Sequence, residues 1–314
     1  MAWIANEEAR KSESGVPSPG VHPSQYRLPA STHVGKVRLA VSDLEASIGF
    51  YSGVIGLTVL SREGNLARLG GQSTGKQSTG KVLLELESLP GVQPILDGKR
   101  LGLYHTAFLL PSREDLSSFV QHLRQLGVPF AAGDHLVSEA IYLSDPDGLE
   151  VEVYADRPRQ TWRYTGSQLR MGTQAVDFAS LPRVTADSWH GAPAGTIVGH
   201  IHFYVGDLEQ ATSFYHESLG LDIMVKIPTA LFTSAGGYHH HVGLNVWAAG
   251  SPIAGPTDAR LLSWELVLPD AAEIITTVES LHANGFAASQ DENGRTIVTD
   301  PWGITVALVP ESQQ

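Results

Sequence analysis

Apolar and polar residues alternate in short runs along this chain, and each such run precedes a segment with helical spacing. Alternate positions of residues 37–41 are apolar, as in a half-buried strand. Asp43 follows as a helix-capping residue type, and apolar residues then recur at helical intervals over 44–51, before Gly56. Further strands are predicted near 58–60 and 82–86. These elements form one strand, helix and strands unit.

The same order of elements is predicted a second time. A strand over 105–110 is followed by an amphipathic helix over 113–127. Two more strands then flank the tight turn Asp145-Pro146-Asp147-Gly148. The segment 33–156 therefore holds two units, and Glu150 and Glu152 share one face of the last strand because side chains alternate along a strand.

An internal repeat extends the pattern to the second half of the chain. From Gly199 the sequence G-H-I-H-F-Y-V-G-D-L-E-Q-A-T-S-F-Y-H-E-S-L-G-L aligns without a gap with the sequence from Gly35. A fourth copy starts at Leu262 and ends in D-P-W-G-I-T-V-A, which matches D-P-D-G-L-E-V-E from Asp145. Residues 197–311 thus hold units three and four, and the chain is a duplicated two-unit protein of the α+β class.

Three segments lie outside the units. Residues 1–32 are rich in Ser, Gly, Pro and charge and are predicted to form a mobile or loosely docked arm. The insert G-G-Q-S-T-G-K-Q-S-T-G-K at 70–81 is predicted to be a flexible hairpin loop. Residues 157–196 connect the two halves.

Composition narrows the possible partners and location. The net charge of −12 argues against binding to nucleic acid or to an anionic membrane surface, and no run is long and apolar enough to span a bilayer. Without cysteine there is no thiolate metal site and no disulfide. The prediction is a cytoplasmic protein, with a homo-oligomer left open, and its thirteen histidines are the candidate ligands.

The D-L-x-x-x-x-x-F-Y helix starts and the D-P-x-G turns resemble the vicinal oxygen chelate superfamily. This resemblance implies four βαβββ modules paired into two half-open barrels that cup a divalent metal ion. It also implies ligand positions on the first and last strands of the units. In this sequence those positions hold Lys36, His105, Glu152, His200, Ser263 and Ala307.

Only units two and three retain ligand residue types at these positions. His105, His200 and Glu152 form the set of two imidazoles and one carboxylate that binds non-haem Fe(II) and leaves positions open for substrate and oxygen. If neighbouring units paired, these ligands would be divided between two barrels. We therefore infer that unit two pairs with unit three and unit one with unit four. A strand histidine can also be a plain core residue, and His202, on the same face as His200, competes for its role.

The resemblance is most specific toward extradiol dioxygenases, in particular catechol 2,3-dioxygenases of the two-domain bacterial type. L-Y-H-T-A-F-L-L-P, V-S-E-A-I-Y-L-S-D-P-D-G and S-A-G-G-Y-H-H-H-V-G-L-N-V-W carry it. It implies an Fe(II) centre, with Mn(II) as the alternative metal, that opens a small aromatic diol with O2. It further implies that the phenol of Tyr142 reaches the metal-bound substrate oxygen and that the triple-His segment supplies an acid/base histidine.

Alternation permits either His239 and His241, or His240 alone, to face the cup. We expect His241 to be the acid/base, with His240 second, and His135, His202 and His239 to contact substrate. In a different interpretation the triple-His segment is an exposed polar strand start.

Two other functions remain open at this stage. A glyoxalase-like isomerase or lyase would use a second carboxylate ligand, and the strand with Asn245 and Trp247 offers none. A small-molecule binding protein would need no acid/base residue at all. Arg157 either binds a substrate carboxylate or forms a structural ion pair in the connector.

Overall fold

The structure is a computed structural model that describes residues 19–72, 80–96 and 98–313. The central part of the predicted hairpin-loop insert and the first eighteen residues of the predicted arm lie outside these ranges.

Four βαβββ units follow one another, as the repeat predicts. The first comprises β1 (His33–Val41), α1 (Leu44–Gly53), β2 (Thr58–Glu63), β3 (Leu66–Gly70) and β4 (Val82–Ser88). The second comprises β5 (Gly102–Leu109), α2 (Arg113–Leu126), β6 (Ala131–Asp134), β7 (Ser138–Ser144) and β8 (Glu150–Asp156). The pattern did not predict β3, which is a short strand.

The second half of the chain repeats this order. The third unit comprises β11 (Ile197–Tyr204), α3 (Leu208–Ala211) with its π-helical continuation (Thr212–Ser218), β12 (Asp222–Ile227), β13 (Ala230–Ser234) and β14 (Val242–Asn245). The fourth comprises β15 (Arg260–Leu268), α4 (Ala271–Ala283), β16 (Ala288–Gln290), β17 (Thr296–Thr299) and β18 (Thr305–Pro310). The connector adds a helical turn (Arg159–Thr161) and the hairpin of β9 (Tyr164–Thr165) and β10 (Gln168–Leu169); a final turn (Glu311–Gln313) follows β18.

Each unit starts its helix in the same way. The side chains of Asp43, Ser112, Asp207 and Asp270 accept hydrogen bonds from main-chain N–H groups in the first turns of α1, α2, α3 and α4. Such caps satisfy N–H groups that have no partner inside the helix, and each stabilises a helix by about 1 kcal/mol.

The strands form two eight-stranded sheets that join units across the repeat. One sheet has the order β12-β13-β14-β11-β5-β8-β7-β6, and the other has the order β16-β17-β18-β15-β1-β4-β3-β2. Unit three is therefore hydrogen-bonded to unit two, and unit four to unit one. The antiparallel pairs β11·β5 and β15·β1 are the seams between units.

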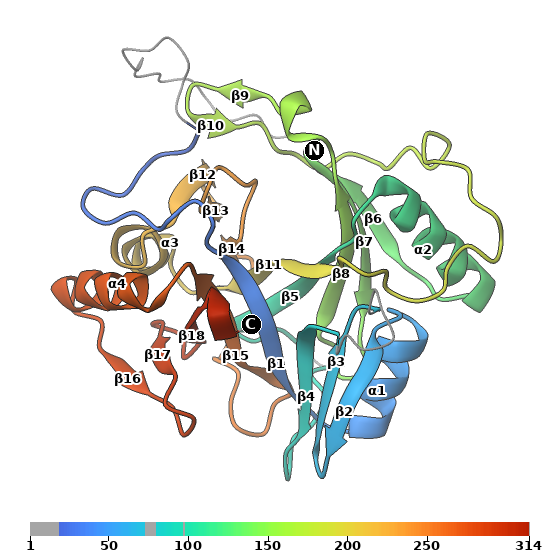
Figure 1. The fold of residues 1–314 in the computed structure, drawn as a ribbon, viewed down its shortest axis with the longest axis horizontal. Helices are drawn as coiled ribbons and strands as arrows, with labels where there is room; N and C mark the ends of the chain where they lie inside the picture. Colours follow the sequence, from blue (N-terminus) through green and yellow to red (C-terminus); the bar gives the residue numbers. More distant parts are fainter. Residues whose placement is uncertain (1–18, 73–79, 97, 314) are drawn as a thin grey trace.

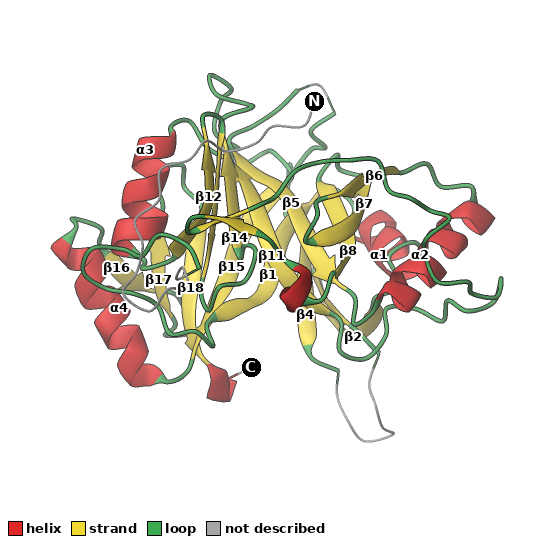
Figure 2. Cartoon of the chain, turned by 90° about the horizontal axis from the view of Figure 1, so that it is seen from above, coloured by secondary structure: helices red, strands yellow, loops and turns green. Residues whose placement is uncertain are grey.

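The two sheets lie against each other through their central strands, with β1 contacting β11 and β15 contacting β5. The helices lie at the two ends of this arrangement, α1 and α2 at one end and α3 and α4 at the other (Figure 1, Figure 2). One continuous core fills the space between the two sheets, and it includes the strand residues Val37, Phe108, Phe203 and Trp264.

Two buried Tyr–Asp hydrogen bonds connect one sheet to the other. Tyr51 of α1 donates its hydroxyl to Asp145 in the β7–β8 turn at 3.2 Å, and Tyr215 donates to Asp300 in the β17–β18 turn at 3.0 Å. The same aspartates accept two main-chain N–H groups each within their turns. The tyrosine of each F-Y motif therefore bonds to the first aspartate of a D-P-x-G turn in the other sheet.

Residues 19–32, the part of the predicted arm that the structure describes, contact the edge strand β12 and helix α4. Val21 exchanges two main-chain hydrogen bonds with Ile223 on the edge strand β12. Arg27 pairs with buried Asp222 at 2.7 Å, and Tyr26 donates to Glu273 of α4. Covering an exposed edge strand removes a surface prone to unwanted pairing.

Within the described ranges, no helix is long and apolar enough to cross a membrane.

The buried carboxyl group of Asp145 gives a testable pH dependence. Burial raises its pKa to about 7, far above the value near 4 of an unfolded chain. Between these pH values the folded state holds the proton and the unfolded state has lost it, so the contribution of Asp145 to the free energy of unfolding falls as pH rises. We expect Asp145→Asn to remove this fall.

Chemical denaturation of both proteins at pH 4, 5.5 and 7.5 measures the effect. The stability of the variant relative to the parent should rise with pH, by an amount on the order of a few kcal/mol. Asp177→Asn, at an exposed connector residue, is the control and should show no such trend. A pH-independent difference for Asp145→Asn would contradict the raised pKa.

Candidate metal centre

Three polar side chains from three strands meet inside the sheet formed by units two and three. Ala107 of β5 pairs with Glu152 of β8 on one side and with His200 of β11 on the other. His105 lies two residues from Ala107 and so shares its face. The strand register therefore directs His105, Glu152 and His200 to one place.

The three donor groups are close together and shielded from water. The Glu152 carboxylate oxygen Oε2 lies 3.0 Å from His105 Nε2 and 3.1 Å from His200 Nε2. One ligand atom from each residue falls within 4.8 Å of the other two. None of the three residues exceeds 3% exposure.

The hydrogen bonding at this cluster fits a bound cation. Neither ring nitrogen of His105 forms a hydrogen bond with a described residue, although Nε2 lies only 3.0 Å from the Glu152 oxygen Oε2. Buried polar groups almost always have partners, so an orphaned imidazole needs an explanation. Two imidazoles and a carboxylate around a common point are a ligand set for a divalent metal with open coordination positions.

The protonation states also suit a cation. Burial would raise the pKa of Glu152, but His200 and His105 hold it well below its usual range, so the carboxylate is ionised. Burial lowers the pKa of His200 to about 4 despite the attraction of Glu152. A neutral imidazole is the form that binds metals.

A second group of possible ligands, His200, His239 and His240, overlaps the first. The Nδ1 atoms of His239 and His240 are 2.8 Å apart and bond to each other, and His239 Nε2 bonds to Asp156 at 3.0 Å. This group contains no carboxylate. The set of His105, Glu152 and His200 is therefore the better candidate for a divalent metal.

His202, the predicted competitor of His200, lies beside this cluster with a different partner. Its ring packs over Gly243, where an added Cβ would come within 2.8 Å of the ring. Its Nε2 is 3.0 Å from the side-chain nitrogen of Asn245, which acts as the donor because the Asn245 oxygen accepts the N–H of Trp247. Because Nε2 of His202 accepts this hydrogen bond, it does not serve as a metal ligand here. His202 instead lines the cavity beside the cluster.

A cavity of about 210 Å³ is lined by His105 and Glu152, while His200 lies outside its described wall. Its walls come from several elements. They include the predicted residues His105, Glu152, Tyr142, His135, His202 and His240, together with Phe232, Trp247 and the connector segment 171–173. The connector segment covers the cavity, a role that its sequence did not indicate.

Tyr142 and His135 form a hydrogen-bonded pair in this cavity. The Tyr142 hydroxyl is 2.6 Å from His135 Nε2, and His135 Nδ1 is 2.9 Å from the Gly172 carbonyl oxygen. A carbonyl only accepts, so Nδ1 carries a hydrogen and a neutral His135 accepts the Tyr142 proton at Nε2. Burial, and then Glu152, raise the pKa of Tyr142 well above its usual range, which keeps the phenol protonated.

In the triple-His segment, the structure places His240 in the cavity wall and His241 outside it. His240 lines the cavity, with its ring centroid 4.0 Å from that of His200. His241 is not part of the described cavity wall: its Nδ1 accepts the Ala235 N–H, and its ring packs against Tyr238. His239 also lies behind the wall. The segment precedes β14 as a buried loop, so strand alternation does not apply and the polar strand start is not observed.

All three rings are buried, which changes the expected acid/base behaviour. Burial lowers the pKa of His241 to about 3, and burial and the adjacent histidines lower that of His240 well below its usual range. Both His240 and His241 are therefore neutral near pH 7.

Other predicted positions are resolved by their contacts. Arg157 pairs with Asp134 at 2.9 Å and with buried Glu139 at 3.1 Å, which agrees with the alternative of a structural ion pair.

In the sheet of units one and four, the ammonium of Lys36 lies 3.2 Å from Glu85 and 3.5 Å from Glu265. A side-chain cation thus stands between two carboxylates where the repeat would place a ligand.

Comparisons with known proteins agree with this architecture. The family model described as Glyoxalase/Bleomycin resistance protein/Dioxygenase superfamily matches residues 33–153 and 197–308. The chain belongs to this superfamily.

The catechol-2,3-dioxygenase of Bacillus subtilis (strain 168) is 42% identical over 283 residues, which cover 88% of this chain and 97% of that protein. Solved structures show the same fold at low identity. A B. subtilis strain 168 protein with a provisional dioxygenase assignment has a TM-score of 0.62 at 14% identity, over 91% of this chain and 86% of its own. Glyoxalase I from Zea mays has a TM-score of 0.53 at 18% identity, over 90% and 93%.

Gly199 tests how tightly the cluster is supported. Gly199 is the extra residue of a bulge in β11, and a Cβ there would lie 1.9 Å from the Tyr154 hydroxyl oxygen. Tyr154 packs on His200 and bonds Tyr238 at 2.7 Å. We expect Gly199→Ala to cost about 1–3 kcal/mol of unfolding free energy by overpacking, and to weaken metal binding.

Denaturant unfolding and titration with divalent metal measure the two effects. The control is Gly49→Ala, at a helical position with open space around the new methyl group. It should be neutral or slightly stabilising, because alanine favours helices over glycine. Parental stability and metal affinity in Gly199→Ala would show that this close approach is unimportant.

Proposed function

We propose that this protein is a non-haem Fe(II) extradiol dioxygenase that opens the ring of a catechol-type diol with O2. The observation that carries the proposal is the buried set of His105, Glu152 and His200, in which the His105 nitrogens lack hydrogen-bond partners. The relationship to the B. subtilis catechol-2,3-dioxygenase supports the same reaction.

His105, Glu152 and His200 would hold the iron, and Mn(II) is the alternative metal. When bound, the ion supplies a Lewis acid and a meeting place for the diol and O2. The ionised Glu152 and two neutral imidazoles would leave one net positive charge on a divalent ion. That charge favours a substrate that binds as an anion.

His240 is the acid/base residue that the cavity geometry supports. Asp156 only accepts hydrogen bonds, so His239 Nε2 donates to it and a neutral His239 accepts at Nδ1. His240 Nδ1 must then be the donor in the 2.8 Å contact with His239. This sequence of bonds leaves His240 Nε2 with a free lone pair, ready to accept a proton from the diol.

Tyr142 and His135 bound the other side of the diol. Since the Tyr142 hydrogen is directed at His135, its oxygen presents lone pairs to the cavity and can accept a substrate hydroxyl hydrogen. Phe232 and Trp247 supply apolar surface for the ring. The wall is thus polar near the three donors and apolar away from them.

Aerobic incubation of Fe(II)-loaded protein with catechol and ring-substituted catechols tests the proposal. A yellow ring-cleavage product should form, and iron analysis after anaerobic loading should give one iron per chain. His105→Ala and His200→Ala should each lose bound iron and activity, because two ligands hold a divalent metal poorly.

His202→Ala is the matched control, since this histidine lines the same cavity but bonds Asn245. It should retain stoichiometric iron. Failure to cleave any catechol by iron-loaded protein would overturn the proposed function. Retention of iron by His105→Ala and His200→Ala would overturn the ligand assignment.

Asp156 acts in this scheme by orienting His239 and, through it, His240. Asp156→Asn offers an amide that can donate to His239 Nε2 and so reverse the order of hydrogen bonds. We expect kcat to fall by about tenfold to a hundredfold, with KM for catechol within about twofold and iron content unchanged, in steady-state assays of iron-loaded protein.

Asp156→Glu should recover part of the lost kcat because it restores a carboxylate. The exposed connector variant Asp177→Asn should behave as the parent protein. A fall in iron content or stability that matches the fall in kcat would instead assign Asp156 a structural role.

A further inference from the structure

A second cavity, of about 350 Å³, adjoins the metal cavity. It lies where the starts of β5 and β8 and the end of β11 meet the loops before β5 and before β15. Tyr104 contributes to the walls of both cavities, so its ring is the partition between them.

A bulge places Tyr104 at this position. His202 of β11 pairs with His105, and the next residue, Phe203, pairs with Leu103, which leaves Tyr104 as the extra residue of β5. A bulge re-aims a side chain relative to regular alternation. The ring of Tyr104 contacts His105 and His202 on one side and stacks on Tyr204, with centroids 4.5 Å apart.

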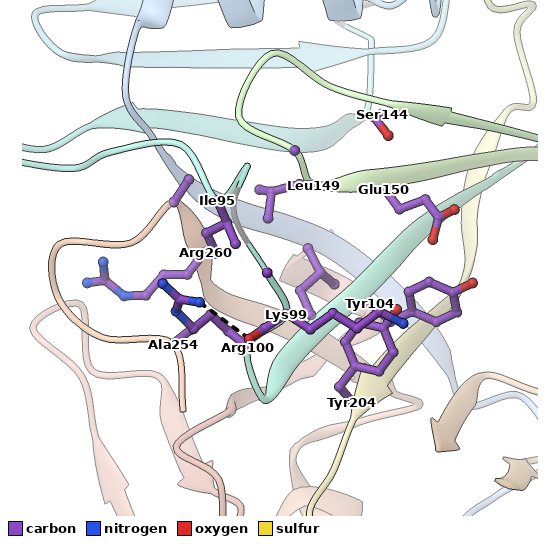
Figure 3. Close-up of a pocket in the computed structure, with 14 residues that line it drawn as sticks. Ile95, Lys99, Arg100, Tyr104, Ser144, Leu149, Glu150, Tyr204, Ala254 and Arg260 are labelled. Atoms are coloured by element: carbon purple, nitrogen blue, oxygen red, sulfur yellow. Dashed lines mark hydrogen bonds between the residues drawn. The ribbon is translucent and has the colours of Figure 1, made fainter. Parts of the chain in front are cut away.

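Three cationic side chains line this second cavity. Lys99 extends along it to the two tyrosines, and the guanidinium groups of Arg100 and Arg260 gather toward the other end (Figure 3). Lys99 Nζ lies 4.8 Å from the centroid of the Tyr204 ring. Arg100 is 3.3 Å from Asp258, so part of its charge is compensated.

Lys99 and Arg260 lie farther from the described carboxylates than a close ion pair requires, although the charge of Lys99 still acts on Glu150. Within the described part of the chain, the structure records no ion pair to a carboxylate within 4.0 Å for either of them. Arg260 donates instead to the carbonyl oxygens of Pro256 and Asp258. A cavity with two such cations is suited to an anion.

The remainder of the wall is mostly apolar, with Ile95, Leu103, Leu149 and Ala254. Among the described wall residues Glu150 is the one acid, and it lies beside Tyr104 at the end of the cavity away from Arg100 and Arg260 (Figure 3). The matching ligand therefore has one anionic group and a small carbon skeleton.

Extradiol cleavage makes such a molecule from one that lacks the charge. The carbon–carbon bond next to the diol and the O–O bond break, and both oxygen atoms enter the product. The ring supplies the four electrons that reduce O2. One carbon becomes a carbonyl and the other a carboxylic acid, which releases its proton to water. A neutral diol thus leaves as a conjugated carboxylate.

We propose that the cavity of Lys99, Arg260 and Tyr104 is a binding site for a conjugated carboxylate next to the metal cavity. The inference rests on the proposed function for its substrate class. The carboxylate has two sources, the ring-opened product on its way out or an acidic substituent of the diol. Both place an anion beyond Tyr104, where Lys99 can pair with it.

Binding of sorbate, an open-chain conjugated carboxylate, to iron-loaded protein tests the site directly by calorimetry. Lys99→Gln and Arg260→Gln should each weaken sorbate binding by about five- to twentyfold. Lys226→Gln removes an exposed lysine on β12 and is the charge-matched control; it should leave sorbate affinity unchanged. The measurement is repeated with the cavity beside the iron filled by 4-nitrocatechol, whose own binding is followed by its absorbance.

Unchanged sorbate affinity in both Lys99→Gln and Arg260→Gln would overturn the proposal, as would complete displacement of sorbate by 4-nitrocatechol. Failure of 4-nitrocatechol to bind, with sorbate binding still sensitive to Lys99, would overturn the proposed function and leave the anion site standing.

Steady-state kinetics distinguish the two sources of the carboxylate, the ring-opened product and an acidic substituent of the diol. A weaker product inhibition in Lys99→Gln with an unchanged KM for catechol assigns the site to product, and a raised KM for 3,4-dihydroxybenzoate alone assigns it to substrate.

Discussion

The antiparallel pairing of β5 with β11 is the constraint on which the candidate site depends. It joins two units that are separated by the whole connector, and its register sets His200 opposite Ala107 and His202 opposite His105. Two bulges in this pair, at Gly199 and Tyr104, adjust it locally. One gives Tyr154 room to support His200, and the other turns Tyr104 into a partition between two cavities. A slip of one residue would point the ligands at the opposite face of the sheet.

Burial then decides the chemistry of the groups that the pairing brings together. Removing imidazoles from water disfavours their charged form, so His200 and His240 remain neutral and available as ligand and base. A carboxylate buried without a permanently charged partner is costly, and the described walls of the cavity around Glu152 contain no Lys or Arg. A divalent cation at this point would satisfy Glu152 and the orphaned His105 together, which ties metal binding to the stability of the core.

The two sheets have diverged while keeping the contacts that hold them together. Tyr51 with Asp145 and Tyr215 with Asp300 repeat the same hydrogen bond at both ends of the molecule. In the sheet of units one and four, Lys36 stands between Glu85 and Glu265, which also pair with Arg68 and Arg295, so side-chain cations neutralise both carboxylates. That sheet can therefore remain folded without a metal, and it supplies a wall of the carboxylate cavity through Arg260.

The sequence by itself determined the four units, the helix cap Asp43 and the strand positions of His105, Glu152 and His200, because periodicity, capping residues and a gapless repeat are local signals. It also indicated that units two and three belong together, since only they retain ligand residue types. It did not reveal β3, the docking of the arm on β12, or the roles of Tyr104 and segment 171–173, which depend on contacts between residues far apart in the chain. Which of His240 and His241 lines the cavity was likewise decided by tertiary structure: the triple-His segment is a buried loop, where the direction of each ring follows from its hydrogen-bond partners and not from alternation along a strand.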